Sequence, residues 1–343
     1  MKKKNKQVLV TGGLGYIGSH TVVVLQRKGF EVIIIDDLSN SSKSVAEAIS
    51  KITGITPTVH VLDLKHKEAV KHFFITYPDL TNVIHFAAYK AVGESVEDPI
   101  AYYDNNLGSL INVLQNLKGR ESVNFIFSSS CTVYGEADEF PITELAPIKE
   151  ALSPYGNTKQ IGEGIIRDFA RANSNFNAIL LRYFNPIGAH HSGLIGERSN
   201  GIPQNLLPYL MQTALGIREK LNVYGGDYDT LDGTAIRDYI HVVDLAEAHL
   251  VALKRLIGNE NIVNTEVFNI GTGNGVTVLE MIETFKKVTH HDVAYQIVER
   301  RAGDVEKAFA DTSKAEYTLN WKAERSLGKA IKDAWKWEQT DSE

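Results

Sequence analysis

The chain of 343 residues contains a single cysteine, Cys131, so it can form neither an internal disulfide nor a CxxC zinc or redox site. This cysteine usage suits a reducing cytoplasm. Long apolar runs are also missing: the run at residues 32–35 is ended by two aspartates, far short of the ~18 residues that a membrane helix needs. No signal-peptide apolar region follows the basic segment 1–6, so we expect a cytoplasmic protein.

Neither sign of charge dominates the sequence. Lys and Arg number 36 against 42 Asp and Glu, which gives a net charge of -6. We therefore expect neither nucleic acid nor a membrane as a partner. With 43% apolar and 23% charged residues, the composition indicates a large buried core and excludes disordered, collagen-like and coiled-coil classes.

Several enzyme motifs are absent as well. No HExxH, P-loop or GxSxG segment occurs, which argues against metalloprotease, kinase and hydrolase functions. The adjacent pairs His190–His191 and His290–His291 would point apart on a strand or a helix. We interpret them as loop or surface residues, and we predict no metal site.

What the first half contains is an alternation of short β-branched runs with segments of helical periodicity. The expected strands are 7–10, 31–35, 59–62, 82–87, 123–128 and 178–183. The expected helices are 17–28, 44–51, 67–77, 101–117 and 155–172. This pattern predicts an α/β fold with a Rossmann-like, doubly wound parallel sheet.

The rhythm changes near residue 185, where Gly and Pro become frequent, and 225–233 has the composition of a loop. We expect a dinucleotide-binding domain at 1–184 and a smaller C-terminal α/β substrate domain at 185–343, with the chain free to cross back between them. A ligand should then lie in the crevice at the carboxyl edge of the sheet.

A glycine-rich turn, TGGLGYIG at residues 11–18, follows the first expected strand and opens the first expected helix. It fits GxGxxG in the required strand-turn-helix context. Glycines let the backbone approach a pyrophosphate, whose charge is met by free N–H groups and the helix dipole. The alternative is a turn whose glycines serve packing alone.

An acidic residue, Asp36, ends the second expected strand 18 residues after Gly18. Such a carboxylate can accept hydrogen bonds from the adenosine ribose hydroxyls and would repel a 2′-phosphate, so the sequence predicts NAD rather than NADP. The neighbouring Asp37 should point to the opposite face, where a solvated role is expected.

Tyr155 and Lys159 lie four residues apart, a spacing that places both on one face of a helix. An ammonium and a positively charged nicotinamide ring both favour the phenolate, which could take a proton from an alcohol. The hydroxyl-rich segment 128–135 directly follows a strand and can supply a hydrogen bond to the reacting oxygen. The alternative is an amphipathic helix with an exposed lysine.

Six segments together carry a family resemblance: TGGLGYIGSH, HFAAYKAVGES, FSSSCTVYG, SPYGNTK, LRYFNPIGAH and RDYIHVVDLA. In this order and spacing the chain resembles the extended short-chain dehydrogenase/reductase family, and within it the epimerases that act on UDP-glucose. The resemblance runs from about residue 8 to residue 337. It implies that NAD transiently oxidises the sugar C4 hydroxyl and that hydride returns to the other face, which interconverts UDP-glucose and UDP-galactose.

The same resemblance implies roles for individual residues. Tyr155 is expected as the acid/base, Lys159 as the group that lowers its pKa and binds the nicotinamide ribose, Ser130 as the partner of the C4 oxygen, and Thr132 as a supporting hydroxyl. The residues expected to bind NAD are Gly12, Gly15, Tyr16, Ile17, Gly18, Asp36, Asn40, Asp63, Leu64, Phe86, Ala87, Lys90, Asn105, Ser128, Tyr155, Lys159 and Tyr183. The residues expected to bind the nucleotide sugar are Ser130, Asn185, Asn205, Leu206, Tyr224, Arg237, Arg301, Asp304 and Ala308.

Two positions depart from the family pattern. Cys131 replaces the usual Ala after the third Ser, a change between small residues. Ala308 falls where some epimerases that handle only the unsubstituted sugar have a bulky Tyr beside C2. Room there would admit UDP-N-acetylglucosamine and its galacto epimer, unless a neighbour such as Phe309 fills the space.

Three other functions have to be compared with these residues. A nucleotide-sugar 4,6-dehydratase needs an acidic pair after the hydroxyl residue, and Cys131 to Val133 offers none. A UDP-glucuronate 4-epimerase stays open, as does an NAD-sensing regulator without turnover, although a sensor has no need of Tyr155 and Lys159. The resemblance also implies a homodimer through helices 101–117 and 155–172.

Overall fold

A computed structural model describes residues 6–198, 201–301 and 303–341. Most of the basic N-terminal segment considered above, residues 1–5, lies outside the described residues. Among the described residues, no helix combines the length and apolar character needed to cross a membrane.

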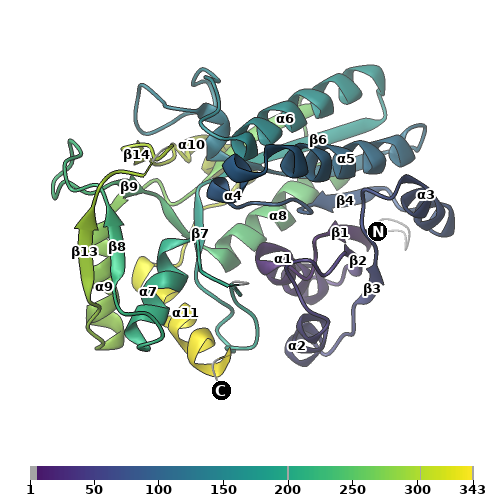
Figure 1. Cartoon of the computed structure of the whole chain (residues 1–343). Coiled ribbons are helices and arrows are strands. Elements are labelled where there is room, and N and C mark those ends of the chain that lie inside the picture. The colour runs from purple at the N-terminus through teal and green to yellow at the C-terminus, as the bar shows by residue number, and fades with distance from the viewer. Residues whose placement is uncertain (1–5, 199–200, 302, 342–343) are drawn as a thin grey trace.

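A seven-stranded parallel sheet forms the centre of the molecule (Figure 1). Its strands are β1 (Gln7–Thr11), β2 (Glu31–Asp36), β3 (Thr58–Val61), β4 (Asn82–His85), β5 (Val123–Ser130), β6 (Phe176–Tyr183) and β11 (Thr265–Ile270). Their order is β11-β6-β5-β4-β1-β2-β3. The order reverses at β1, between β2 and β4, which confirms the doubly wound α/β prediction and marks the edge where ligands bind such sheets.

Helices cover both faces because alternate residues of each strand point to opposite sides. From β1, Val8 and Val10 pack into one apolar cluster and Leu9 into another. On the first side lie α1 (Tyr16–Arg27), α2 (Ser44–Thr53) and α8 (Val242–Ile257). On the second side lie α3 (Lys67–Thr76), α5 (Pro99–Leu117) and α6 (Pro154–Ala172).

The elements expected from the sequence match these within a few residues at each end. Two short elements were not expected: α4 (Val92–Glu97) and the 3-10 helix η2 (Cys131–Tyr134). Neither is long enough to show a helical period. Both lie beside the carboxyl edge of the sheet and shape the cavity described below.

A smaller region lies beside this edge. It contains β7 (Asn185–Ile187), β8 (Leu221–Tyr224), β9 (Ile236–Arg237), β10 (Tyr239–His241), β12 (Val276–Thr277), β13 (Tyr295–Val298) and β14 (Lys307–Ala308). Its helices are α7 (Leu206–Ala214), α9 (Val278–Thr289) and α11 (Leu327–Asp341), whereas α10 (Ser313–Leu319) packs on β11 and α8 of the large sheet. A separate apolar cluster around Met281, Phe285 and Trp335 holds α7, α9 and α11 together.

The chain does cross back between the two regions. After β10, α8 packs against α1, and β11 pairs in parallel with β6 along the whole of residues 265–270. A single boundary at residue 184 therefore does not separate two cores, because α8 and β11 follow it in the sequence but pack in the first region. The expected domain limits stay a prediction.

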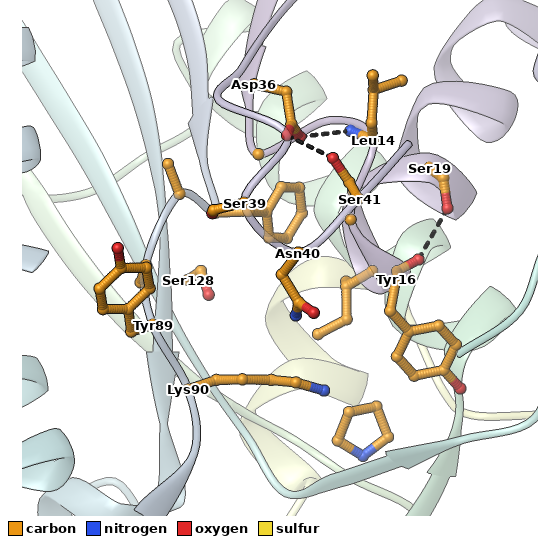
Figure 2. Close-up of a pocket in the computed structure, with 18 of the residues that line it drawn as sticks. Leu14, Tyr16, Ser19, Asp36, Ser39, Asn40, Ser41, Tyr89, Lys90 and Ser128 are labelled. Carbon is orange, nitrogen blue, oxygen red and sulfur yellow. Dashed lines mark hydrogen bonds between the residues drawn. The ribbon is translucent and has the colours of Figure 1, made fainter. Parts of the chain in front are cut away.

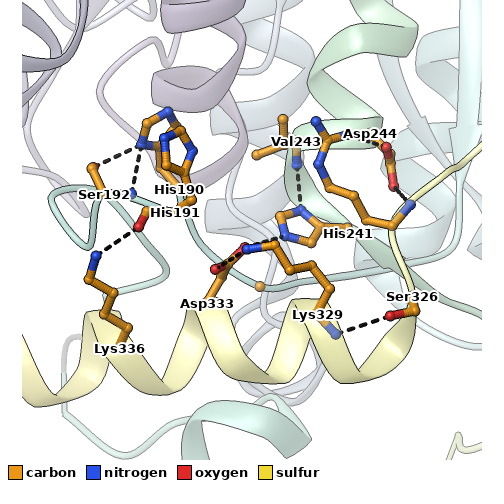
Figure 3. A network of polar contacts seen from close by, with 12 residues as sticks. His190, His191, Ser192, His241, Val243, Asp244, Ser326, Lys329, Asp333 and Lys336 are labelled. Atoms are coloured by element: carbon orange, nitrogen blue, oxygen red, sulfur yellow. Dashed lines mark hydrogen bonds and ion pairs between the residues drawn. The ribbon is translucent and has the colours of Figure 1, made fainter.

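Polar contacts join α11 to the segments that follow β7 and β10 (Figure 3). His241 caps α8 by accepting from the N–H of Val243, and its Nε2 lies 3.2 Å from Asp333 of α11. His190 is 3% exposed and its ring lies 4.2 Å from that of His191. Both histidines lie in the loop after β7, as expected, but His190 is buried there, and the two rings lie side by side at a tilt of 38°. No group of three or more potential metal ligands occurs among the described residues.

Candidate active site

The glycine turn brings the first helix unusually close to the end of β1. Gly12 has φ +67°, and a Cβ there would lie 2.9 Å from the backbone nitrogen of Ala87. A Cβ at Gly18 would lie 2.2 Å from the carbonyl oxygen of Gly12. Both positions therefore require glycine, and their close packing leaves the N-terminus of α1 facing a cavity at the carboxyl edge of the sheet.

Asp36 ends β2 at the same cavity and is 7% exposed. One oxygen accepts from the Leu14 N–H at 2.9 Å, and the other accepts from the Ser41 hydroxyl at 2.6 Å (Figure 2). The second oxygen also accepts from the Leu38 N–H at 3.0 Å. A carboxylate offers about four lone-pair sites, so these contacts orient Asp36 at the cavity, and its bonds to the ribose hydroxyls stay a prediction.

Asp37 is solvated as expected, but it also lines the first cavity, so it does not lie wholly on the opposite face of the strand end. It is exposed and accepts hydrogen bonds from the backbone N–H and hydroxyl of Ser39, which closes a local turn.

Every residue expected to bind the cofactor lines this one cavity. Besides the glycine turn and Asp36, the lining includes Asn40, Asp63, Leu64, Phe86, Ala87, Lys90, Asn105, Ser128, Tyr155, Lys159 and Tyr183. The residues come from the ends of β1 to β6 and from α5 and α6, so the structure brings together positions that run from residue 12 to residue 183.

The start of α6 places Tyr155 and Lys159. Ser153 caps the helix by accepting from the Gly156 N–H at 3.1 Å, and Pro154 occupies its first turn, as is common at helix starts. The Lys159 ammonium donates to the Ser128 carbonyl oxygen at 2.7 Å and lies 5.8 Å from the centre of the Tyr155 ring. The predicted Tyr and Lys thus share one helix face, directly beside the end of β5.

The hydroxyl-rich segment also reaches the cavity. Ser130 ends β5 and accepts from the Thr132 N–H at 3.2 Å, which starts η2. The Thr132 hydroxyl is buried without a hydrogen-bond partner in the described structure. Ser128 and Tyr183 bond to one another through their hydroxyls across β5 and β6. The cavity therefore presents Ser130, Thr132 and Tyr155 together.

Burial dominates the titration of the pair on α6. It raises the pKa of the Tyr155 phenol to about 12, against the lowering effect of the Ser130 side chain, and lowers the pKa of the Lys159 ammonium to about 8. A positive charge brought into the cavity, such as a bound nicotinamide ring, would act with the Lys159 ammonium to lower the pKa of the phenol. The expected role of Lys159 stays a prediction.

A second cavity adjoins the first and shares Asn40, Lys90, Thr132, Asn185 and Asn205 with it. It adds four of the residues expected to bind the sugar nucleotide: Arg237, Arg301, Asp304 and Ala308. Arg301 donates to Asp304 at 2.8 Å through one of its terminal nitrogens. This cavity thus carries two arginines, whose planar forks suit phosphate oxygens.

Ala308 lies on the wall of the second cavity with 7% of its surface exposed. Its neighbour Phe309 stacks on Phe140, with ring centres 5.5 Å apart, and is not part of the cavity lining. Phe309 therefore does not fill the space beside Ala308.

Two expected substrate residues lie outside the lining of both cavities. Leu206 begins α7 and packs against the apolar cluster of the smaller region. Tyr224 ends β8, is 40% exposed, and lies under Arg301, whose guanidinium is 5.4 Å from its ring. Their expected contacts with the nucleotide sugar stay a prediction.

Sequence reasoning missed three residues that shape the site. Glu197 accepts from Lys90 at 2.6 Å and from Asn205 at 2.7 Å, Ser41 holds Asp36, and Trp337 of α11 lines the first cavity. The serine-rich run after Asp36 was a signal for Ser41. Glu197 and Trp337 had none, because their partners lie far away in the sequence.

The fold and the cavity define a dinucleotide-binding enzyme with a Tyr–Lys pair and a serine beside the cofactor site. The chain belongs to the NAD dependent epimerase/dehydratase family, whose model matches residues 8–271. It is 47% identical to the UDP-glucose 4-epimerase of Haemophilus influenzae over 334 residues, which cover 97% of this chain and 98% of that protein.

Solved structures give the same assignment. The UDP-glucose-4-epimerase of Stenotrophomonas maltophila, crystallised with NAD and formylated UDP-arabinopyranose, superposes with a TM-score of 0.93 at 43% identity, covering 98% of this chain and 99% of that one. The UDP-glucose 4-epimerase of Bifidobacterium longum, in complex with NAD+ and UDP, gives 0.93 at 44% identity with the same coverage. NAD is therefore the cofactor, as the sequence predicted.

Substitution of Gly18 tests the glycine turn. In Gly18→Ala the new Cβ would collide with the Gly12 carbonyl oxygen, 2.2 Å away, and push α1 from the strand ends. We expect the purified variant to carry less than about a tenth of the NAD bound by the wild type, because helix and phosphate contacts depend on that approach. Release of nucleotide by denaturation, followed by chromatography, measures the bound amount.

Gly328→Ala is the matched control. At this position in α11 a Cβ would meet Val288 at 3.4 Å, an ordinary contact, so bound NAD should equal that of the wild type. Equal NAD contents in all three proteins would contradict a turn that depends on Gly18.

Proposed function

We propose that this protein interconverts UDP-glucose and UDP-galactose by NAD-dependent epimerisation at the sugar C4. The observation that carries the proposal is that Tyr155, Lys159 and Ser130 line the first cavity together with Thr132 and Asn185, which also line the second. One cavity has the glycine turn and Asp36 that suit a dinucleotide, and the other has the arginines that suit a nucleotide diphosphate. The relatives named above carry the same activity in their names.

Tyr155, Ser130 and Lys159 each have a proposed role in the reaction. Tyr155 accepts the proton of the C4 hydroxyl and returns it later, while Ser130 donates a hydrogen bond that fixes the C4 oxygen. Lys159, held by the Ser128 carbonyl, keeps a positive charge near the phenolate and binds the nicotinamide ribose. NAD, when bound, supplies the acceptor for the C4 hydride and gives the hydride back.

The burial of Tyr155 implies that the cofactor has to bind before this side chain can act as a base. Because burial holds the phenol pKa at about 12, the side chain is protonated at neutral pH until positive charge enters the cavity. A cofactor with a cationic ring adds that charge beside the phenol. Tyr155 therefore becomes a competent base with oxidised cofactor in place, and it is a poor base without it.

The second cavity would bind the diphosphate part of the substrate. Arg237 and Arg301 would hold the diphosphate, Asn185 and Asn205 line the passage between the cavities, and Asp304 keeps both arginines in place at 3.9 and 2.8 Å. A nucleotide sugar held at its diphosphate leaves the sugar ring free to turn over beside Tyr155.

We propose further that the pocket accepts N-acetylated sugars. Ala308 pairs with Arg237 across β9 and β14, so its small side chain lies next to the diphosphate clamp on the cavity wall. With Phe309 stacked on Phe140, space remains at this wall for a group larger than a hydroxyl.

We also propose that the protein is a cytoplasmic homodimer. Ile100 and Ile111 of α5 and Ile161 of α6 are 72%, 39% and 37% exposed, and α5 packs directly on α6. A second copy covering this two-helix face would bury these side chains, which favours association.

Removing the phenolic hydroxyl tests the proposed chemistry. Tyr155→Phe should lower turnover of UDP-galactose by about 10²- to 10⁴-fold, the usual contribution of a positioned acid/base, while bound NAD stays at the wild-type level. The assay incubates enzyme with UDP-galactose without added NAD and separates the nucleotide sugars by chromatography. Activity of the variant close to that of the wild type would assign the base to another residue.

A bulky residue at 308 tests the proposed substrate range. Ala308→Tyr should lower turnover of UDP-N-acetylgalactosamine at least about tenfold more than that of UDP-galactose, since a lost fit of this size is typically about 1–3 kcal/mol. Ala308→Ser keeps a small side chain and should retain both activities. Full turnover of the acetylated sugar by the Tyr variant would refute the idea.

Light scattering of the purified protein tests the dimer. We expect twice the monomer mass, and we expect Ile161→Glu to shift the protein towards monomer because it places a charge in the buried face. Ile262, 86% exposed outside these helices, supplies the control, and Ile262→Glu should stay dimeric. A monomeric wild type would end this proposal and leave the catalytic one untouched.

A further inference from the structure

A buried carboxylate lies on α6 behind the proposed catalytic pair. Glu163 follows Lys159 by four residues and Tyr155 by eight, so all three share one helix face. Its side chain is 2% exposed, and no step of the reaction proposed above uses it. Burial of a charge without close partners is costly, so the contacts of this carboxylate should show what it does.

Both oxygens of Glu163 are fully engaged. Oε1 accepts from the Ser129 hydroxyl at 2.6 Å and from Arg182 Nε at 2.8 Å. Oε2 accepts from a terminal nitrogen of Arg182 at 2.6 Å and from Arg167 at 2.9 Å. Arg182 is itself 3% exposed, so the central pair is a bidentate ion pair removed from water.

Ser129 connects this pair to the reacting groups. It stands between Ser128, whose carbonyl oxygen holds the Lys159 ammonium, and Ser130, the proposed partner of the C4 oxygen. In the sheet, Ser129 lies directly opposite Arg182 of β6. The Glu163 carboxylate of α6 therefore bonds to residues that lie opposite one another on β5 and β6.

The network continues towards the second cavity. The Arg182 guanidinium lies 4.8 Å from the centre of the Tyr134 ring, and the Tyr134 hydroxyl donates to Asn269 at 2.6 Å. Asn269 in turn donates to the carbonyl oxygen of Ile142, which lines that cavity. The contacts thus link α6, β5, β6 and the sugar side of the site.

A buried ion pair is weak evidence for stability, because well-packed apolar residues often stabilise a core equally well. What directional bonds add is geometry: they allow one register between helix and strands. We propose that Glu163 is a positioning residue that, through Ser129 and Arg182, fixes Tyr155 and Lys159 of α6 against Ser128 and Ser130 of β5. This inference rests on the proposed epimerase function.

The reaction requires precise relative positions of the groups on α6 and β5. Tyr155 and Lys159 come from a helix, whereas Ser130 comes from a strand, and a shift of about 1 Å between reacting groups can cost about 10²-fold in rate. The two arginines proposed to hold the substrate diphosphate line the second cavity and lie outside α6 and β5. Loss of the register should therefore affect kcat more than KM.

Ser129→Ala removes the link between carboxylate and strand while leaving the ion pair in place. We expect kcat for UDP-galactose to fall about tenfold, KM to stay within about twofold, and bound NAD to remain unchanged. The acid limb of the kcat–pH profile should also move to higher pH, because the Ser128 carbonyl would hold Lys159 less firmly near Tyr155. Glu163→Gln should show the same pattern with a larger loss of kcat.

Arg167→Gln is the matched control. Arg167 also bonds to Glu163 but is 39% exposed and contacts neither strand in that network, so its loss should leave kcat, KM and the pH profile unchanged. Glu163→Gln leaves the buried Arg182 without a charged partner and can impair folding. Ser129→Ala is therefore the decisive variant, and its kinetics are measured below its unfolding temperature.

The outcomes separate this inference from the proposed function. An inactive wild type would remove the proposed epimerase activity itself. An active wild type with a Ser129→Ala variant of lower thermal stability but unchanged kcat and pH profile would reduce the network to a structural one and overturn the inference. Equal falls in kcat for Ser129→Ala and Arg167→Gln would overturn it too.

Discussion

The close approach of Gly18 to the carbonyl oxygen of Gly12 is the constraint on which the rest of this site depends. It lets α1 begin where β1 ends and aims free N–H groups of the helix at the ligand cavity. The acid at the end of β2 fits this arrangement because Asp36 accepts from the N–H of Leu14 in the same turn. The backbone geometry of the glycine turn thus sets the positions of both α1 and the Asp36 contact in the cofactor half of the site.

The proposed chemistry depends on burial in a different way. The environment that removes water from Tyr155 and Lys159 moves both pKa values against the ionised forms. The Ser128 carbonyl accepts a hydrogen bond from the ammonium, and one helical turn further along α6 Glu163 and Arg182 neutralise one another. The reactivity of Tyr155 therefore depends on the charge of whatever occupies the first cavity, which this side chain lines.

Sequence reasoning recovered the parts of this protein that are local. The parallel strands, their helices, the glycine turn and the Tyr–Lys spacing all follow from short-range patterns and known strand-turn-helix chemistry. It failed where partners are distant, as for Glu197 with Lys90 or Ser129 with Glu163, because no periodicity links such positions. Nor did the sequence predict that His190 is buried within its loop, since burial depends on tertiary packing.

The return of α8 and β11 to the large sheet makes the two regions inseparable. A fragment ending at Tyr183 would leave β6 as an open edge, with its backbone groups ready to pair with another chain, and would strip the apolar cover of α8 from α1. The cofactor-binding half is contiguous in the sequence to that point, yet it completes its core with residues donated from 242–270. Recombination that exchanges substrate regions between relatives would therefore have to leave this returning segment with the first half.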